Sequence, residues 1–568
     1  MLDEAQRKAV KKRKIWGSIF ALSIIALRVA VLIIALPVIQ YYLKFEFIDW
    51  DTGINPVPAT LTAEQRLKDF DYMYDLVCQQ NPRKAYFEQA YGFSYDDLYN
   101  KYREYVVNSK SEYEFFSYMS CFLAVLPGEH NLMTIPDYDH TARNGTYALL
   151  EIYASQDVKD YAEAWKTSFR KDVEKYMEYS LIPFKYVDGK YIGVNVHSDK
   201  YNNISDYAGG QILTLNGRDP KEMCFEFFDV EQPIHDSGND CYFRSRLFFN
   251  NGTGIKYEAE ILMPDGSIVK ADLYDDPMYD AAYVGAAFSY RDLITGVTED
   301  QAAEPTDEPD TTDIEKEPES YYIAADPERK LVYFNWKACR YEEGDRLVED
   351  LKKALQDADA ENVIVDLREN SGGDSDYCHS QVLPVLFNHD VEYASEVIGR
   401  QNEISKQFYN NLISRFDLFK YVKFEDGNYI YSEDLSVDGK AEKNYRLYVL
   451  TSQKTFSSGD MITNICKQYD NAVIIGTNTG GEGIAGALFN CYLPESRFMF
   501  AYAPGTSIPH PEDSYCGTEP DVYMHQTVED YLARMAKDEE GVDSGSYEVR
   551  KTWDTTLNYV IDEITKAA

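Results

Sequence analysis

The residues best placed to do chemistry form the segment Thr455–Asp460 (TFSSGD), which lies between two strand-like runs, 445–452 and 472–476. A serine at the junction of a strand and a helix lies beside free backbone N–H groups, which can stabilise a developing oxyanion. A second glycine-rich turn, 370–373, follows the buried-strand pattern Val363–Leu367. Two such turns could supply a nucleophile and an oxyanion site, and this pattern favours a hydrolase.

Each residue of this pattern also has a purely structural interpretation. Ser457 is a poor nucleophile until a base removes its proton, and the spacing fits a helix-capping serine equally well. The N–H of Ser458 is the natural first oxyanion donor. Gly372 or Gly373 could give the second, because a glycine lets the backbone approach a substrate closely. By spacing alone, however, these two glycines favour a simple turn.

The elements that must position these residues follow from the pattern of apolar residues. Residues 320–568 alternate helix and strand, with buried strands expected at Val363–Leu367, Leu447–Thr451 and Val473–Ile475, which predicts an α/β core with partly parallel pairing. Residues 61–180 are predicted to be mainly helical, 186–275 to form a β-rich module, and 296–319 to be an acidic linker.

Four motifs in this order resemble those of the serine peptidase family of tail-specific (C-terminal-processing) proteases and the tricorn core protease. Asp366–Gly373 matches Asp-Leu-Arg-x-Asn-x-Gly-Gly, and Thr455–Asp460 matches Thr-x-Ser followed by an acidic residue. Ile475–Gly481 matches Ile-Gly-x-x-Thr-x-Gly, and Gly517–Asp521 matches Gly-x-x-Pro-Asp. The resemblance implies a ClpP/crotonase-like peptidase core, and the β-rich module around Asn216-Gly217 resembles the family's PDZ-like domain.

The chain departs from the tail-specific pattern at the position of the general base. Those members have a lysine shortly after the Thr-x-Gly turn, whereas this chain has Glu482 there, and Lys454 is a poor substitute. The tricorn-like branch takes its base from an upstream histidine, which His130 after Leu126-Pro127-Gly128 resembles. The resemblance therefore implies His130 as the base for Ser457.

Alternatives to this assignment remain at the sequence level. His130 could be a capping or surface histidine, and His379 is a rival base six residues after Gly373. An acidic or hydroxyl group should orient the base. The candidates for that role are Glu129, Glu482, Glu512 and Asp513, and the resemblance selects none of them.

The amino end predicts a membrane anchor. A basic tail, 1–15, precedes a mostly apolar run, 16–39, which is about long enough to span a bilayer at ~1.5 Å per residue. Basic residues on the amino side predict a cytoplasmic N-terminus and an extracellular catalytic region. A cleaved signal peptide is the competing interpretation, and Arg28 within the span has no assigned role.

Composition excludes several classes of partner. The 568-residue chain has 56 basic and 96 acidic residues and a formal net charge of -40, which argues against nucleic acid. The nine cysteines are an odd number without metal-ligand spacing, which argues against a disulfide framework and fits a bacterial cell surface. We expect no metal and no cofactor.

These observations predict a membrane-anchored extracellular serine endopeptidase that acts on a peptide or protein. Its acyl-enzyme would form on Ser457 with His130 as base, and the N–H groups of Ser458 and of Gly372 or Gly373 would hold the oxyanion. The β-rich module would bind an extended peptide by strand addition. The alternatives are a catalytically inactive relative that binds peptides or apolar ligands, and a hydrolase or lyase of the crotonase type.

Overall fold

The computed structural model divides the chain into two compact units. The second unit, Val57–Asp137, Ala162–Asn402 and Val422–Ala568, holds every element discussed below except helix α13 (Glu403–Tyr409), which belongs to the first. The structure describes residues 60–79, 81, 84–126, 130–134, 164–165, 167–169, 172, 179–198, 201–203, 205–229, 231–278, 320–409, 422–483, 489–503, 505–508 and 517–567.

The predicted tail (1–15), membrane anchor (16–39) and acidic linker (296–319) lie outside these residues. Within the ranges given above, no helix is long and apolar enough to cross a membrane. The anchor therefore stays a prediction from the sequence.

A six-stranded sheet forms the centre of the C-terminal region. Its first two strands are antiparallel, and every other neighbouring pair is parallel. The parallel strands are nearly continuous apolar runs because helices cover both faces of the sheet. The strand order is β12 (Tyr321–Asp326), β13 (Leu331–Trp336), β14 (Asn362–Asp366), β18 (Arg446–Thr451), β19 (Ala472–Gly476) and β23 (Val522–Tyr523).

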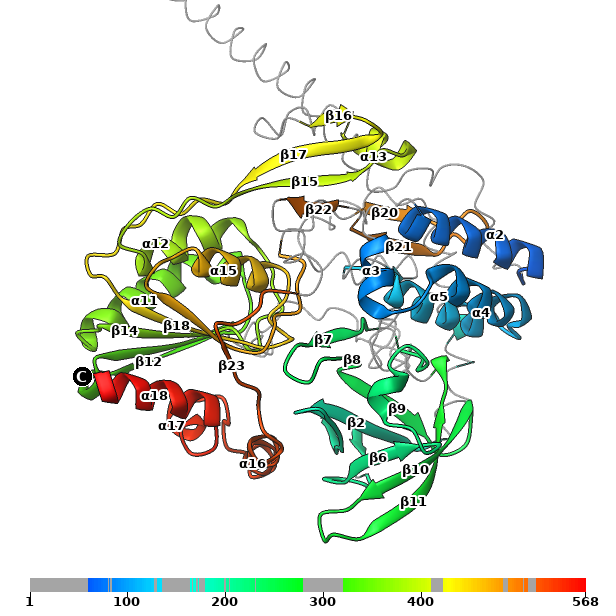
Figure 1. The fold of residues 1–568 in the computed structure, drawn as a ribbon, viewed down its shortest axis with the longest axis horizontal. Coiled ribbons are helices and arrows are strands. Elements are labelled where there is room, and N and C mark those ends of the chain that lie inside the picture. Colours follow the sequence, from blue (N-terminus) through cyan, green and yellow to red (C-terminus); the bar gives the residue numbers. More distant parts are fainter. Residues whose placement is uncertain are drawn as a thin grey trace, which may run out of the picture. The chain divides into compact units, whose positions relative to one another are not determined.

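Helices lie on the two faces of this sheet (Figure 1). On one face, α18 (Thr555–Ala567) packs Leu557, Val560 and Ile564 against alternate residues of β13, β14, β18 and β19. On the other lie α11 (Gly344–Asp357), α12 (Leu383–Leu386) and α15 (Ser458–Lys467). This arrangement confirms the α/β core with partly parallel pairing that the sequence predicts.

A buried ionic cluster ties the C-terminal helices to the end of β14. The Asp366 carboxylate accepts from Arg368 at 2.6 Å, from Arg550 at 2.7 Å and from the Tyr333 hydroxyl at 2.8 Å. Asp554, just before α18, accepts from Arg368 at 2.6 Å. Burial alone would raise the pKa of Asp366, but the two guanidinium groups hold that pKa well below its usual range.

Residues 181–275 form a closed barrel with its own apolar core, which includes Phe184, Leu215 and Leu273. The strands β3 and β6 share a single paired position, Ile192 with Gln211, beside hydrogen bonds from Gly193 N to Gly210 O and from Gly209 N to Gly193 O, so this is the shortest strand pairing of the barrel. The barrel strands in order are β10 (Ile255–Leu262), β11 (Ile268–Asp275), β9 (Arg246–Asn250), β2 (Leu181–Val187), β3 (Lys190–Gly193) and β6 (Gln211–Leu215).

Helices dominate the described residues before the barrel. Side chains of Thr62, Ser94 and Ser111 cap the N-termini of α2, α4 and α5, where unpaired backbone N–H groups need acceptors. Helix α5 is buried along almost its entire length, including Phe115, Phe116 and Met119. The elements are α2 (Ala63–Tyr74), the π-helix η1 (Asp75–Gln79), α3 (Lys84–Tyr91), α4 (Tyr95–Asn108) and α5 (Glu112–Val125).

The remaining strands form small sheets. β1 (Leu132–Thr134) pairs with β21 (Met499–Tyr502), which pairs with β20 (Phe489–Tyr492), and this sheet anchors the chain just after His130. The other elements are β4 (Val196–Ser198), β5 (Tyr201–Asn203), β7 (Ile234–Asp236), β8 (Cys241–Phe243), β15 (Ala394–Arg400), β16 (Lys423–Glu425), β17 (Asn428–Asp434), β22 (Gly505–Ile508), η2 (Pro220–Met223), η4 (Pro327–Arg329), η5 (Tyr341–Glu343), η6 (Cys378–Val382), α16 (Val528–Glu539) and α17 (Tyr547–Arg550).

The ionic cluster predicts a large and pH-dependent loss of stability in Asp366→Asn. Removing one charge of a buried network leaves Arg368 and Arg550 incompletely paired, so we expect a loss of about 3–5 kcal/mol at pH 7. Because the folded-state pKa of Asp366 is depressed, this difference should shrink as the pH falls below about 4. Chemical denaturation against pH checks both expectations. Asp272→Asn, in an exposed pair with Lys256, is the control at ~0–1 kcal/mol, and an equal loss there would contradict the account.

Candidate active site

Three turns meet at one edge of the central sheet. Strands β14, β18 and β19 are parallel neighbours, so the turns that follow them all leave from their carboxyl ends. Those turns are 367–373, 452–457 and 477–483, which hold three of the sequence motifs. This edge is where open parallel sheets form their sites.

Ser457 is held in an unfavourable backbone conformation at the start of α15. Its φ and ψ are 54° and -122°, although it has a Cβ atom, and such strain costs on the order of 1–3 kcal/mol. Two hydrogen bonds hold it: Ser457 N donates to Gly481 O at 3.0 Å, and Phe456 N donates to Asn370 O at 2.9 Å. Ser457 occupies the N-cap position, but its side chain makes no capping hydrogen bond.

The Ser457 side chain instead contacts His130. His130 Nε2 lies 3.2 Å from Ser457 Oγ, and His130 Nδ1 lies 3.2 Å from Glu482 Oε2. An ionised carboxylate can only accept a hydrogen bond, so with Glu482 ionised Nδ1 is the donor and Nε2 is free to accept from the serine hydroxyl. The structure therefore places these three side chains in one continuous line.

Elements on both sides of His130 fix its position. Helix α5 ends at Val125, and the Asn131 amide donates to the carbonyls of Leu123 and Leu126 at 3.3 and 3.0 Å. Strand β1 then begins at Leu132. The Phe456 ring packs on the imidazole with 4.7 Å between centroids, which leaves the His130 side chain 27% exposed.

Asp460 holds the loop that carries Glu482. Its buried carboxylate accepts from the hydroxyls of Thr479 at 2.5 Å and Thr518 at 2.6 Å, and from Gly483 N at 3.1 Å. The Glu482 side chain itself is fully buried. The acidic residue three positions after the serine thus acts on the site by shaping a loop.

Gly372 lies directly against the serine. A Cβ atom at this position would lie 2.7 Å from Ser457 Cβ and 2.9 Å from Phe456 O, and its φ of +98° disfavours any other residue. Asn370 shapes the same turn, because its side-chain oxygen accepts from Gly372 N at 2.8 Å and its amide donates to Trp336 O at 3.0 Å. The amide of Gly372 is therefore occupied.

Two backbone amides beside Ser457 have no acceptor among the described residues, those of Ser458 and Gly373. Gly372 O accepts from Cys339 N at 2.8 Å, and a planar trans peptide directs the Gly373 N–H to the opposite side. The Ser458 hydroxyl donates to Gly373 O at 2.7 Å and so joins the two turns. Of the two glycines expected as donors, the geometry leaves Gly373 available.

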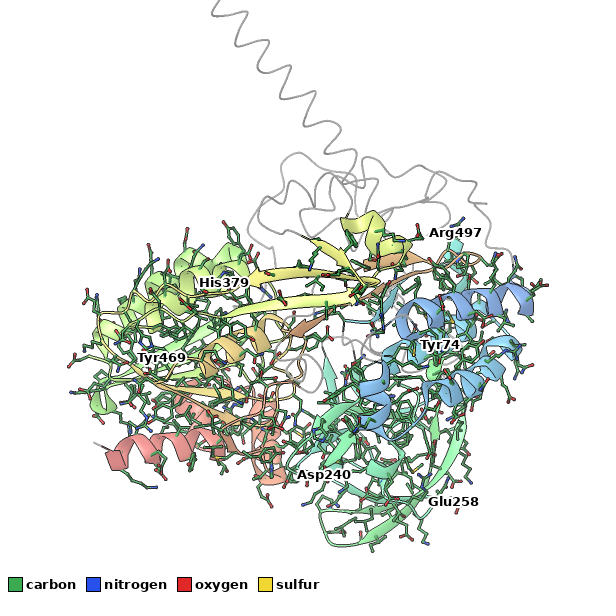
Figure 2. The ribbon with its side chains drawn as sticks, turned by 45° about the horizontal axis from the view of Figure 1, so that its top comes forward. Tyr74, Asp240, Glu258, His379, Tyr469 and Arg497 are labelled. Carbon is green, nitrogen blue, oxygen red and sulfur yellow. The ribbon has the colours of Figure 1, made fainter. Side chains whose placement is uncertain are left out.

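The other candidate residues from the sequence lie elsewhere or outside the described ranges. His379 lies on η6, where its Nδ1 atom is 3.1 Å from Ser375 O, and Figure 2 labels it on this helical layer. Two histidines that were not candidates also have partners elsewhere: His525 pairs with Asp188, and His389 with Asn388. Glu129, Glu512 and Asp513 fall outside the described residues.

No role for Phe456 or Thr518 follows from the sequence, although Phe456 contacts His130 and Thr518 contacts Asp460. Phe456 lies inside one motif and Thr518 inside another, so their position next to motif residues was the available signal. Neither residue type implies such a contact without the fold.

A strained serine beside a histidine, at the strand ends of an α/β core, is the arrangement of a serine hydrolase. Residues 333–523 match the model of peptidase family S41, and this match spans all three turns of the site. Residues 333–523 are therefore a serine peptidase domain of that family, which confirms the recognition made from the motifs. No curated protein matches this sequence.

Several solved structures are similar at low identity. The crystal structure of mature CPAF is 13% identical with a TM-score of 0.47, and the alignment covers 89% of this chain and 98% of that chain. The photosystem II D1 C-terminal processing protease is 14% identical with a TM-score of 0.33, covering 82% and 94%. The tricorn protease is 13% identical with a TM-score of 0.30, covering 89% and 37%.

The contact at Gly372 predicts that Gly372→Ala disrupts the serine turn. The added methyl group would press on Ser457 and Phe456, and a displacement of about 1 Å can cost on the order of 100-fold in reactivity. The rate at which a fluorophosphonate labels the protein measures this. Gly266→Ala is the control, because Gly266 also has a positive φ, +84°, but nothing lies within 4 Å of its added methyl group. Equal rates for the two variants would contradict the proposed packing.

Proposed function

We propose that this chain is a membrane-anchored extracellular serine endopeptidase that cleaves peptide bonds through an acyl-enzyme on Ser457. The observation that carries the proposal is the line from Ser457 Oγ to His130 Nε2 and from His130 Nδ1 to Glu482 Oε2, both at 3.2 Å. A nucleophile beside a base that is itself held by a third group is the arrangement that activates a serine.

In the first step, His130 acts as the general base. Its Nε2 atom accepts the Ser457 proton while Ser457 Oγ attacks the carbonyl carbon of the scissile peptide bond. The carbonyl oxygen becomes an oxyanion, and the free N–H groups of Ser458 and Gly373 donate to it. These amides are fixed by the backbone, so they need little reorganisation as the charge develops.

In the later steps, the proton on His130 passes to the leaving amine, and the peptide bond breaks to give an ester on Ser457. A water molecule then attacks the ester carbonyl as His130 Nε2 takes its proton. The same two amides stabilise the second oxyanion, and breaking the ester returns the proton to Ser457. The product with the new carboxyl end is then released.

Glu482 is proposed to orient His130. Its fully buried carboxylate would fix the ring with Nδ1 protonated and stabilise the imidazolium that forms during the reaction. Glu482 occupies the position at which tail-specific proteases have their lysine base. In this chain, the glutamate at that position would instead orient a histidine base. Asp460 holds the Glu482 loop through Gly483.

The proposal also covers the membrane anchor, the extracellular location of the peptidase region and the binding of peptides. The basic tail and apolar run at the N-terminus support a single membrane span with the peptidase region outside the cell. The barrel 181–275 is proposed as the PDZ-like peptide-binding module. Because the barrel is closed, strand addition would use the short pairing between β3 and β6.

Labelling with a fluorophosphonate, followed by peptide mapping, tests the proposed chemistry. We expect a covalent adduct on Ser457 in the full-length chain, none in Ser457→Ala, and labelling slowed by at least ~100-fold in His130→Ala because the base is lost. His379→Ala is the matched control and should react like the wild type, since His379 bonds to Ser375 O.

Three results would contradict the proposal. An adduct on another serine would exclude Ser457 as the nucleophile. Undiminished labelling of His130→Ala would exclude His130 as the base. A folded wild-type protein that is not labelled would favour the catalytically inactive, peptide-binding alternative.

A further inference from the structure

A second polar pocket lies between the barrel and the central sheet, away from Ser457 and His130. Strand β2 of the barrel supplies Lys185, the turn after β18 supplies Lys454, and helix α16 supplies Arg534. The cavity measures about 120 Å³, several times the ~10–15 Å³ that one water molecule needs. It therefore has room for a small ligand.

The carboxylates that line this pocket already have partners. Glu369 pairs with Arg534 at 2.8 Å, and Asp188 pairs with His525 at 2.6 Å. Asp236 accepts from the Tyr186 hydroxyl at 2.7 Å and from the Tyr523 hydroxyl. Each of these carboxylates thus has a partner, and Glu369 is also a negative charge that acts on Lys185 and on Lys454.

Lys185 and Lys454 are the two lysines that line this pocket, and their ammonium groups lack a described partner. Neither ammonium group forms an ion pair or a hydrogen bond with any described residue, and Lys185 Nζ lies 4.7 Å from the centre of the Tyr531 ring. Burial first, and then the charges of Lys454 and Arg534, lower the pKa of Lys185 to about 7. Lys185 is half-buried and Lys454 is exposed, and the positive charge of Lys454 acts unfavourably on Lys185. Such neighbouring lysines are unexpected in a chain of net charge -40.

We propose that this pocket binds an oxyanion, a carboxylate, sulfate or phosphate group, between Lys185 and Lys454. Such a ligand supplies the negative oxygens that both ammonium groups lack, and the hydrogen bonds would be charge-assisted. Arg534 of helix α16 lines the same pocket, and the Tyr531 ring of that helix contacts Lys185. This is a binding site separate from the peptidase centre, so it does not depend on the proposed catalytic roles.

The same turn connects this pocket to the serine. Lys454 N donates to Ser452 Oγ at 3.1 Å, and that hydroxyl donates to Arg368 O at 2.6 Å. Thr455, the next residue, donates its hydroxyl to Leu367 O at 2.8 Å. A bound oxyanion would thus contact the turn that leads to Ser457.

Calorimetric titration of the full-length Ser457→Ala variant with sodium sulfate tests the site, because binding there needs no catalysis. We expect one saturable site per chain, with affinity at least about tenfold weaker in Lys185→Gln and in Lys454→Gln. Lys270→Gln is the control, since Lys270 is exposed on the barrel and pairs with Glu260. Absence of saturable binding, or an equal loss in Lys270→Gln, would overturn the proposal.

Two further sets of titrations identify the class of ligand and test whether Lys185 binds it. Titration with phosphate, with acetate and with a short peptide as free acid and as amide distinguishes inorganic anions from a peptide carboxyl end. Sulfate affinity should be highest below pH 7 and fall toward pH 9 as Lys185 loses its proton. The groups that face Lys185 are Lys454, Arg534, Glu369, Arg246 and Tyr531.

His525 also lines the pocket, so the pH series is repeated in Lys185→Gln. Burial also lowers the pKa of Lys454, so the fall in affinity between pH 7 and pH 9 should become smaller in this variant without vanishing. A fall as large as that of the chain with Lys185 present would contradict the role of Lys185.

Discussion

The site depends on the backbone clamp that holds Ser457 in its strained conformation. Phe456 N donates to the turn after β14, and Ser457 N donates to the turn after β19, so the serine turn is fixed on both sides. Each of these turns leaves the carboxyl end of a parallel strand, and the register of the sheet sets their spacing. The buried sheet thereby offsets a backbone strain of on the order of 1–3 kcal/mol at one residue.

The base reaches this edge from a distant part of the chain. His130 and Ser457 are 327 positions apart in the sequence. His130 follows the helical region, whereas Ser457 follows a strand of the central sheet. The buried helix α5 and the pairing of β1 with β21 bring the histidine to the serine. A stable arrangement of these elements is therefore a condition for the proposed chemistry.

The sequence predicted the parts of the site that follow from local pattern. Buried strands, glycine turns and the order of the motifs placed Ser457 and Ser458 at one edge, and the missing lysine directed attention to His130. The sequence could not choose among four carboxylates, because which of them lies near His130 depends on loop geometry set by Asp460. It could not choose between Gly372 and Gly373 either, because that depends on the direction of single peptide planes.

The fold shows the same division between local and long-range information. Strand and helix periodicity predicted the α/β core, but closure of the barrel depends on pairing between β3 and β6, which are separate in the chain. The pocket around Lys185 and Lys454 likewise escaped prediction. It unites a barrel strand with a turn of the core, and no spacing in the sequence links them.

A double-mutant cycle between His130 and Glu482 tests the central claim most directly. The rate of acylation at Ser457 is measured in the wild type, His130→Ala, Glu482→Gln and the double variant, with Glu512→Gln and Asp513→Asn beside them. If Glu482 acts only through His130, Glu482→Gln slows the wild type but adds nothing to His130→Ala. Effects that multiply, or a larger loss in Glu512→Gln or Asp513→Asn than in Glu482→Gln, would contradict the account.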